Sequence, residues 1–368
     1  MKILSISTDR KVFEEGSAVR ARLIEYGGLA EELRVIVFAK HSLNLKQEKI
    51  APNIYLYPTN SFLKYTHICA AISKARELKR SGVTIDLVTT QDPFEVGIVG
   101  LKIARILNAR LHIQIHTDFM SKYFVRESLL NRLRVCAAKF VIPHANGIRV
   151  VSERIKNSLS TFSHKLSNIS VLPILVEMSE SEEIISSKDL RKKYPQFDFR
   201  ALVVARLAPE KNVASAIEAM ASIKKYRPNA GLVIVGDGPE RTRLEKLAAQ
   251  LGISKNVIFE GWQNNIFSYY KTADVLVLPS LYEGYGMAVV EASLAGCPVV
   301  MTDVGCAGDL IIDGQNGLVV PAGSTKALVG ALARIVSGEL KFAVKSLQLQ
   351  TKQEYLAAYK KSWQDSLV

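Results

Sequence analysis

Residues 279–292 combine two carboxylates with two glycines directly after a short apolar run. Seven residues separate Glu283 from Glu291, and Gly284 and Gly286 are among them. Glycines let a ligand approach the backbone without a Cβ in the way. A helix beginning after the second glycine would turn its free N–H groups and positive dipole end toward an anion. This pattern suits a diphosphate whose attached sugars donate hydrogen bonds to the carboxylates. The alternative is a solvated loop with a surface glutamate.

Two cations follow another apolar run, Ala201–Ala205. Arg206 and Lys211 are separated by four residues, a spacing abbreviated R-x4-K. At the carboxyl end of a strand, two such cations neutralise a pyrophosphate as one of its bonds breaks. By itself this spacing is a weak signal, because surface charge explains it equally well. Together with the acidic segment it becomes a specific one.

A third glycine-containing turn follows the apolar run that ends at Val235. Gly236 and Gly238 match part of the dinucleotide-binding fingerprint G-x-G-x-x-G, but Arg241 occupies the third glycine position. This departure argues against a dehydrogenase. We therefore expect a close-packed structural turn, followed by a helix that Pro239 opens.

The elements that must position these residues alternate between strand and helix along most of the chain. Continuous apolar runs, without polar alternation, are typical of parallel strands covered by helices on both faces. The predicted strands are 2–7, 34–39, 84–89, 110–116, 147–151 and 169–172, then 201–205, 230–235, 257–260, 275–278, 298–302 and 317–320. The predicted helices include 61–81, 94–107, 213–226, 239–251, 287–295 and 324–337. We expect an α/β fold of two facing, doubly wound Rossmann-like domains, with the active site in the cleft between them.

A length of 368 residues fits two domains. We place the first domain at 1–175, the second at 176–350 and a terminal helix at 351–368. The acidic stretch Glu177–Glu183 is the expected connection. Tyr355, Tyr359 and Trp363 repeat every four residues and must pack on something. Packing on the first domain is expected, and packing on the second is the alternative.

The bulk composition limits the partners and the compartment. The net charge is +13, which indicates nucleic acid, an anionic membrane surface or a phosphate-rich substrate. Nucleic acid is the weakest of these because no nucleic-acid-binding motif is present. The four cysteines form no C-x-x-C pair, which argues against a zinc site and a disulfide framework. No apolar run suits a membrane span or a signal peptide, so we expect a cytoplasmic protein.

Taken in order, these motifs resemble the retaining glycosyltransferases of family 4, which have the GT-B fold. R-x4-K, G-D-G-P and the two glutamates appear in the family's order. They are followed by the further matching segments 296–300, 302–305 and 313–321. The resemblance covers about residues 201–324 closely and the first half of the chain more loosely.

The resemblance implies that the first domain, 1–175, binds the acceptor and that the second, 176–350, binds the nucleotide-sugar donor. It also implies a role for each matching residue. Arg206 and Lys211 would bind the donor diphosphate, Glu283 the transferred sugar and Glu291 the ribose. The backbone near the second glycine would cradle the phosphates, and the turn after strand 257–260 would lie near the nucleobase. For Trp262, a place in the core is an equally good interpretation. The donor-binding residues beyond the four charged ones are Gly16, Gly261, Trp262, Gly284, Gly286, Met287 and Ala288.

The first domain offers fewer matches. His116 ends a strand where the family has a histidine beside the donor sugar, so we count it as catalytic. Asp118 and Asp92 follow strands and would contact the acceptor, although capping the next helix explains each equally well. The family's paired-glycine loop is replaced here by Gly16 alone, and Ser17 beside it is a further candidate near acceptor and phosphate.

The implied reaction needs no metal and no cofactor, because no acidic D-x-D pair follows a strand and the two cations can stabilise the leaving phosphate. The expected activity is retaining transfer of a hexose from a UDP- or GDP-sugar to a saccharide or lipid-linked acceptor. The alternatives are a non-catalytic nucleotide-sugar-binding protein and a nucleotide-sugar epimerase.

The segment Lys122–Lys156 is strongly basic and carries an apolar stripe. Its amphipathic helix, Arg126–Phe140, has two interpretations. One is peripheral contact with an anionic membrane on its cytoplasmic side. The other is a domain helix whose apolar side lies in the core and whose basic side lies in water.

Overall fold

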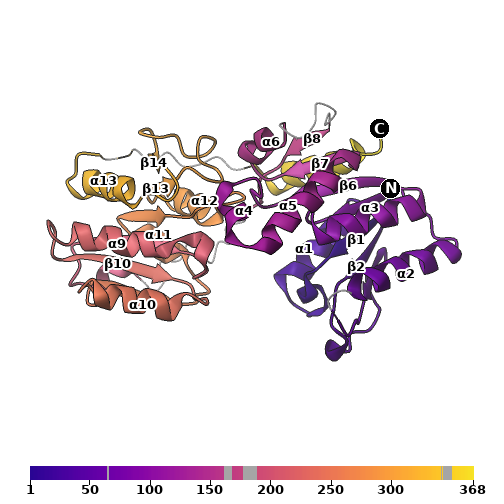
Figure 1. The fold of residues 1–368 in the computed structure, drawn as a ribbon, viewed down its shortest axis with the longest axis horizontal. Helices are drawn as coiled ribbons and strands as arrows, with labels where there is room; N and C mark the ends of the chain where they lie inside the picture. Colours follow the sequence, from indigo (N-terminus) through magenta and orange to yellow (C-terminus); the bar gives the residue numbers. More distant parts are fainter. Residues whose placement is uncertain (64–65, 161–167, 177–188, 341, 343–349) are drawn as a thin grey trace. The chain divides into compact units, whose positions relative to one another are not determined.

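The computed structural model describes residues 1–63, 66–160, 168–176, 189–340, 342 and 350–368. It divides into two compact units, Met1–Pro173 with Gln350–Val368, and Ile174–Leu349. Each unit has a largely parallel sheet with helices packed on it (Figure 1). The predicted connection at 177–183 lies outside the described residues.

The first unit is built on an eight-stranded sheet of order β3-β4-β2-β1-β5-β6-β7-β8. Its strands are β1 Lys2–Ser7, β2 Glu32–Val37, β3 Glu48–Ala51, β4 Ile54–Pro58, β5 Leu87–Thr90, β6 Arg110–Ile115, β7 Gly147–Val150 and β8 Ile169–Val171. All neighbours pair in parallel except β3, which is antiparallel to β4. The expectation of a purely parallel sheet is therefore wrong at this edge, where a hairpin of two short strands completes the sheet.

Helices pack on both faces of this sheet. They are α1 Ala18–Gly27, α2 Thr66–Arg80, α3 Glu95–Leu107, α4 Lys122–Glu127, α5 Leu129–Val141, α6 Glu153–Leu159 and α14 Lys352–Gln364. The helix α3 contacts β5, β6, α2 and α5. The single helix predicted at 126–140 is in fact two, because Ser128 has an extended backbone and caps α5 by accepting from Asn131 N. Within the described part of the chain, no helix is both long and apolar enough to cross a bilayer.

The terminal helix α14 packs on the first unit, opposite to α3. Leu111 of β6 lies near Gly100 of α3, whereas Gln114, three residues further along the strand, points to the other face. There Tyr359 donates to Gln114 Oε1 at 3.1 Å. Buried Arg149 of β7 donates to Gln114 Oε1 at 2.9 Å and to Tyr355 OH at 2.9 Å. The aromatic stripe of α14 thus covers a buried arginine.

The second unit has a six-stranded parallel sheet of order β11-β10-β9-β12-β13-β14. Its strands are β9 Phe199–Val204, β10 Ala230–Val235, β11 Val257–Gly261, β12 Val275–Leu278, β13 Val299–Thr302 and β14 Gly317–Val320. Its helices are α8 Leu190–Lys193, α9 Val213–Ile223, α10 Arg241–Gln250, α11 Phe267–Thr272, α12 Met287–Leu294 and α13 Thr325–Val336.

Strand side chains of this sheet alternate between two apolar clusters. Val203 packs with α9, α10 and α13, whereas Leu202 packs with α8, α11 and α12. Burial on both faces explains why the strands are continuous apolar runs in the sequence. The doubly wound prediction is confirmed for both units.

Candidate functional site

In each sheet there is one place where the chain changes the direction in which it adds successive strands. In the second unit the chain continues from β9 to β10 and β11 on one side, and then returns to β12, β13 and β14 on the other. Doubly wound sheets bind ligands at such a switch point, beyond the carboxyl ends of the strands. The loop 205–212 follows β9 and the loop 279–286 follows β12, so both predicted motifs flank this point. Leu281 N donates to Glu210 O at 2.8 Å and ties the two loops together.

The structure brings Lys211 and Glu283 together. Lys211 Nζ lies 2.6 Å from Glu283 Oε1, and Ser280 Oγ donates to the same oxygen at 2.8 Å. Glu283 is only 8% exposed. A buried carboxylate requires such partners because it has lost water. Ser280 was not predicted; its position three residues before Glu283 was the only available signal.

Arg206 lies in the same loop but extends into solvent. Its side chain is 69% exposed and Nη2 donates to Glu210 Oε1 at 2.6 Å. Arg206 precedes the 3-10 turn Pro209–Lys211, whereas Lys211 ends it. As a result Arg206 points outward and Lys211 points to the Glu283 carboxylate. The site therefore combines one half-buried, paired cation with one accessible guanidinium.

The helix α12 begins at Met287, as predicted, and Gly286 forms its N-cap with a left-handed φ of 97°. A side chain would be strained in this conformation. The first-turn N–H groups of Met287 and Ala288 have no intrahelical acceptor. Gly305 packs closely against this loop, and only a glycine fits there, because a Cβ would lie 2.3 Å from Tyr285 O. Gly284, Met287 and Ala288 are half-buried, so this turn lies at the surface of the site.

Glu291 lies one turn into α12 and has a different partner. The buried hydroxyl of Tyr270, on α11, donates to Glu291 Oε2 at 2.8 Å. Burial, and then the charge of Glu291, raise the pKa of Tyr270 far above its ordinary value, so it remains a donor. Tyr270 lies in another helix and nothing in the sequence motif indicated it.

The G-D-G turn packs directly on the R-x4-K loop. A Cβ at Gly236 would lie 2.0 Å from Ala205 O, and one at Gly238 would lie 2.4 Å from Leu207 O. Both glycines are therefore required for close packing, as expected. The helix prediction needs correction, because α10 begins at Arg241 and Pro239 belongs to the preceding turn.

Gly261 and Trp262 end β11 at the same edge of the sheet. Trp262 is 78% exposed, so its interpretation as a core residue is wrong. Gly261 has a φ of 68°, and its carbonyl accepts from Gly236 N at 2.8 Å. The preceding Glu260 accepts from Lys193 Nζ at 2.5 and 2.7 Å and from the hydroxyl of Tyr194. The indole thus projects from an anchored strand end.

The switch point of the first unit lies between β1 and β5. Ser7 donates to Gln91 Oε1 at 3.3 Å across it. Ser17 is the N-cap of α1: its hydroxyl accepts from Arg20 N at 3.1 Å and donates to Lys11 O at 2.6 Å. Gly16 has a φ of 77° and open space around it. The loops that carry Gly16, Ser17 and Asp92 therefore flank this switch point.

Asp92 accepts from Phe94 N at 2.7 Å just before α3, so it also stabilises the start of that helix. Burial raises the pKa of Asp92 to about 6. His116 follows β6 directly and is exposed at the strand's carboxyl end. Protein atoms around the imidazole, and then the charge of Arg149, lower the pKa of His116, so the ring is neutral at pH 7 although the residue as a whole is exposed.

Asp118 does not cap the following helix, because Ser121 does so by accepting from Tyr123 N at 3.4 Å. The capping interpretation of Asp118 is therefore wrong. Burial raises the pKa of the Asp118 carboxyl, and a nearby positive charge on Arg154 opposes this shift. Asp118 lies two residues after His116, beyond the same carboxyl end of β6.

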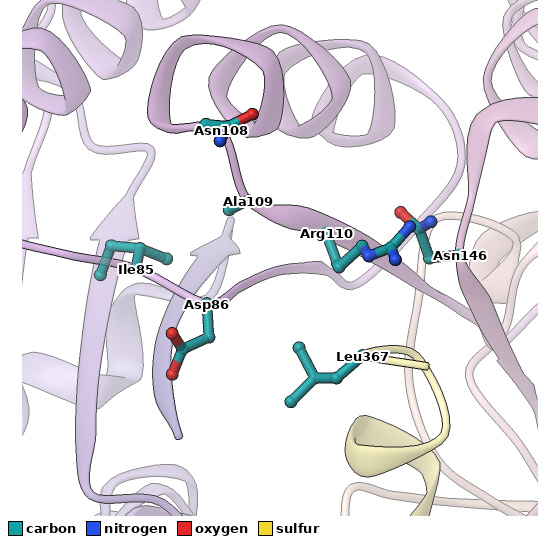
Figure 2. A pocket seen from close by; sticks show the side chains of 7 residues that line it. All are labelled: Ile85, Asp86, Asn108, Ala109, Arg110, Asn146 and Leu367. Atoms are coloured by element: carbon teal, nitrogen blue, oxygen red, sulfur yellow. The ribbon is translucent and has the colours of Figure 1, made fainter.

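A hollow of about 590 Å³ lies at the opposite edge of the first sheet (Figure 2). Figure 2 shows Arg110 extending toward Asn146, with Asp86 and Leu367 across from them. Asp86, Arg110 and Asn146 stand at the amino ends of β5, β6 and β7, whereas Leu367 follows α14. Asp86 accepts from Lys2 N at 2.7 Å, and Asn146 accepts from Leu111 N at 2.9 Å. Each side chain therefore connects the starts of two neighbouring strands. This hollow is therefore separate from the edges where the motif residues gather.

Comparisons with known proteins identify the family. Residues 186–355 match the family described as Glycosyl transferases group 1, and residues 26–180 match Glycosyltransferase Family 4. The chain belongs to this glycosyltransferase family. The resemblance seen in the motifs is therefore confirmed.

Curated relatives differ in what they glycosylate. The chain is 27% identical to alpha-monoglucosyldiacylglycerol synthase of Acholeplasma laidlawii, over 67% of this chain and 65% of the relative. It is 28% identical to alpha-D-kanosaminyltransferase of Streptomyces kanamyceticus, over 63% of both. A third relative, a UDP-Gal:alpha-D-GlcNAc-diphosphoundecaprenol galactosyltransferase of Escherichia coli, is 29% identical over 47% of this chain and 46% of the relative. Each match spans less than two thirds of the relative.

Solved structures match over nearly the whole chain. Alr3699/HepE of Anabaena in complex with UDP has a TM-score of 0.69 at 18% identity, covering 100% of this chain and 95% of that one. The galactosyltransferase WaaB in its apo form has a TM-score of 0.70 at 20% identity, covering 98% and 99%. These likenesses show that the glycosyltransferase has the GT-B fold.

Proposed function

We propose that this glycosyltransferase moves a hexose from a UDP- or GDP-sugar to a saccharide or lipid-linked acceptor. The observation that carries the proposal is the Lys211–Glu283 pair, buried at the switch point next to the N-terminus of α12. A diphosphate would lie at that helix end, where amides and a dipole favour anions. The carboxylate beside it would then accept hydrogen bonds from sugar hydroxyls.

The donor contacts follow from this placement. The amides of Gly284, Gly286, Met287 and Ala288 would cradle the phosphates. Lys211 would approach the diphosphate from inside the site, and Arg206, which is exposed, would close over it from solvent. Glu291, fixed by Tyr270, would accept from the ribose. The base would lie against Gly261 and stack on the exposed indole of Trp262.

Transfer would retain the anomeric configuration, as in the family that the motifs resemble. The bond between the anomeric carbon and the phosphate oxygen breaks while the acceptor oxygen bonds to the same face of the sugar. The acceptor proton passes to the leaving phosphate. Arg206 and Lys211 stabilise the negative charge that grows on that phosphate, which is the role a metal ion plays elsewhere. The reaction would therefore proceed without a metal.

The first unit would supply the acceptor side. His116 is neutral and exposed, so it can accept or donate one hydrogen bond to a sugar hydroxyl. Asp92, Asp118, Gly16 and Ser17 stand at the same carboxyl edge. The names of two relatives contain a lipid, diacylglycerol in one and diphosphoundecaprenol in the other. We therefore also propose peripheral contact with an anionic membrane on its cytoplasmic side.

A ligand screen followed by a kinetic test decides between this proposal and its alternatives. UDP, GDP, ADP and their sugars are first compared by thermal shift, because a ligand that binds the native state raises the melting temperature. The stabilising nucleotide-sugar is then incubated with acceptors in EDTA. A transferase releases free nucleoside diphosphate; an epimerase changes the sugar without releasing it, and a binding protein does neither.

The variant Glu283→Gln separates binding from chemistry. It keeps an acceptor for Ser280 but removes the negative charge next to the sugar. We expect transfer to fall by about 100-fold or more while nucleoside-diphosphate affinity changes little. An equal loss of affinity for the plain diphosphate would contradict the role of Glu283. Loss of activity in EDTA that manganese restores would contradict the metal-free mechanism.

A further inference from the structure

The outer face of α5 is apolar, although the helix lies on the surface. Its large apolar side chains point to solvent: Leu129 is 74% exposed, Leu130 51%, Leu133 67% and Phe140 57%. The side of the helix toward the domain is formed by Asn131, Val135, Ala138 and Val141, all buried. The helix thus has an apolar face that the rest of the first unit does not cover. The interpretation that its apolar stripe belongs to the core is therefore wrong.

Helical geometry gathers these side chains into one strip. Successive residues turn by about 100° in an α-helix, so positions separated by 4, 7 and 11 residues share a face. Leu129, Leu133 and Phe140 have this spacing, with Leu130 on one side of the strip and the exposed Cys136 on the other. The strip runs along the whole of α5. An exposed, continuous apolar strip marks an interaction surface rather than scattered surface residues.

Positive charge borders the strip. Arg132 and Lys139, both exposed, lie along one flank. Arg134 lies on the other flank, but its Nε donates to Glu95 Oε1 at 3.0 Å, so it fixes α5 to α3. Residues 122–144 contain five Lys and Arg residues against Glu127 alone. An apolar strip edged by cations fits an anionic lipid surface, since lipid tails take up the apolar groups and headgroups pair with the cations.

We propose that the outer face of α5 inserts into the interface of an anionic lipid bilayer and holds the enzyme there. This assigns a surface to the membrane contact proposed above, and it rests on that proposal for the identity of the acceptor. Leu129, Leu133 and Phe140 enter the boundary between headgroups and acyl chains. Arg132 and Lys139 remain at headgroup level. The Arg134–Glu95 pair connects α5 to α3 and so holds the rest of the first unit to the inserted helix.

Cys136 offers a direct readout because it lies at the edge of the strip. Cys297 and Cys306 are buried, so replacing the exposed Cys69 with serine leaves Cys136 as the accessible thiol. A polarity-sensitive fluorophore on Cys136 should shift to the blue with vesicles of phosphatidylcholine and phosphatidylglycerol. It should not shift with phosphatidylcholine alone. An unchanged spectrum with both kinds of vesicle would overturn the proposal.

Matched variants test the apolar and basic parts by vesicle co-sedimentation of the otherwise unlabelled protein. Leu133→Gln with Phe140→Gln should lower the partition coefficient by about tenfold or more, because two buried apolar side chains are lost. The control, Tyr226→Gln with Leu251→Gln, removes two exposed apolar side chains of the second unit and should change nothing. Arg132→Gln with Lys139→Gln should lower partition by about tenfold and weaken its salt dependence, whereas Lys225→Gln with Lys246→Gln should change neither.

Two measurements distinguish this proposal from its competitors. Light scattering without vesicles tests whether a second copy covers the strip: a dimer that Leu133→Gln with Phe140→Gln makes monomeric would overturn membrane insertion. Thermal shift with the stabilising nucleotide, also without vesicles, should be identical for all variants. If that shift is absent even in the unmodified protein, the donor proposal fails, whereas vesicle binding by α5 is judged separately.

Discussion

Lys211 Nζ meets Glu283 Oε1 at 2.6 Å although the two residues are 72 positions apart in the chain. Each belongs to a loop that follows one of two neighbouring strands, β9 and β12, on either side of the switch point. The bond therefore fixes the two loops that would hold the donor. It also gives the buried Glu283 carboxylate a cationic partner.

Breaking this pair should destabilise the second unit. Lys211→Met leaves the Glu283 carboxylate buried without its cation, and we expect a loss of about 1–3 kcal/mol, less than for a fully buried pair because Lys211 is partly exposed. Adding Glu283→Gln should recover part of this loss. The coupling is measured by a double-mutant cycle of urea unfolding. The same cycle for the exposed pair Lys352–Glu25, 2.5 Å apart, should give about 0.5 kcal/mol or less. Equal coupling in both pairs would contradict the prediction.

Arg206 should matter for the chemical step and little for stability. Its side chain is 69% exposed, so Arg206→Gln should change the free energy of unfolding by about 0.5 kcal/mol or less. Single-turnover transfer should fall by about 100- to 1,000-fold, since a cation that stabilises the leaving phosphate is removed. Arg243 is the matched control because it is also exposed and paired with a glutamate on its own helix turn, Glu240. Unchanged single-turnover rates in Arg206→Gln would remove Arg206 from the site.

The sequence predicted the geometry of the loop before α12 better than its surroundings, for a physical reason. Gly286 and the helix start at Met287 depend on backbone conformation and neighbouring residues, which a short motif contains. The bond from Tyr270 to Glu291 depends on how α11 packs on α12, and no local pattern contains that. Similarly, periodicity predicted an apolar stripe on α5 but could not tell which side of the helix meets the domain. The antiparallel strand β3 was missed because it is short and half-exposed.

Trp262 should report nucleotide binding by its fluorescence. The protein has two tryptophans, and Trp363 is buried, so a change on adding UDP or GDP would come from the exposed Trp262. Trp262→Leu should abolish that change and weaken nucleotide affinity by about 1–3 kcal/mol, or roughly 5- to 150-fold, if the base stacks on the indole. Tyr226→Leu removes an equally exposed aromatic ring and should leave affinity unchanged. Full affinity in Trp262→Leu would place the base elsewhere.

Asp92 should make stability depend on pH in a defined direction. Burial raises its pKa to about 6 in the folded protein, above the ordinary value of the unfolded chain. The folded state therefore binds the proton more tightly, and its contribution to stability is complete at low pH and lost as pH rises through about 6. Asp92→Asn is neutral at every pH and keeps an oxygen for Phe94 N. It should therefore be more stable than the unmodified protein at pH 7.5, by up to about 2–3 kcal/mol.

The stability difference between Asp92→Asn and the unmodified protein should depend on pH if the buried charge of Asp92 causes it. Below about pH 4 both proteins carry a neutral side chain at position 92, so their melting temperatures should converge. Glu15→Gln removes an exposed carboxylate of the same unit and should give a flat difference across the range. A constant difference for Asp92→Asn from pH 4 to 7.5 would mean that the substitution acts through packing. If Asp92 also contacts the acceptor, Asp92→Asn should raise the KM for acceptor and leave nucleotide affinity unchanged.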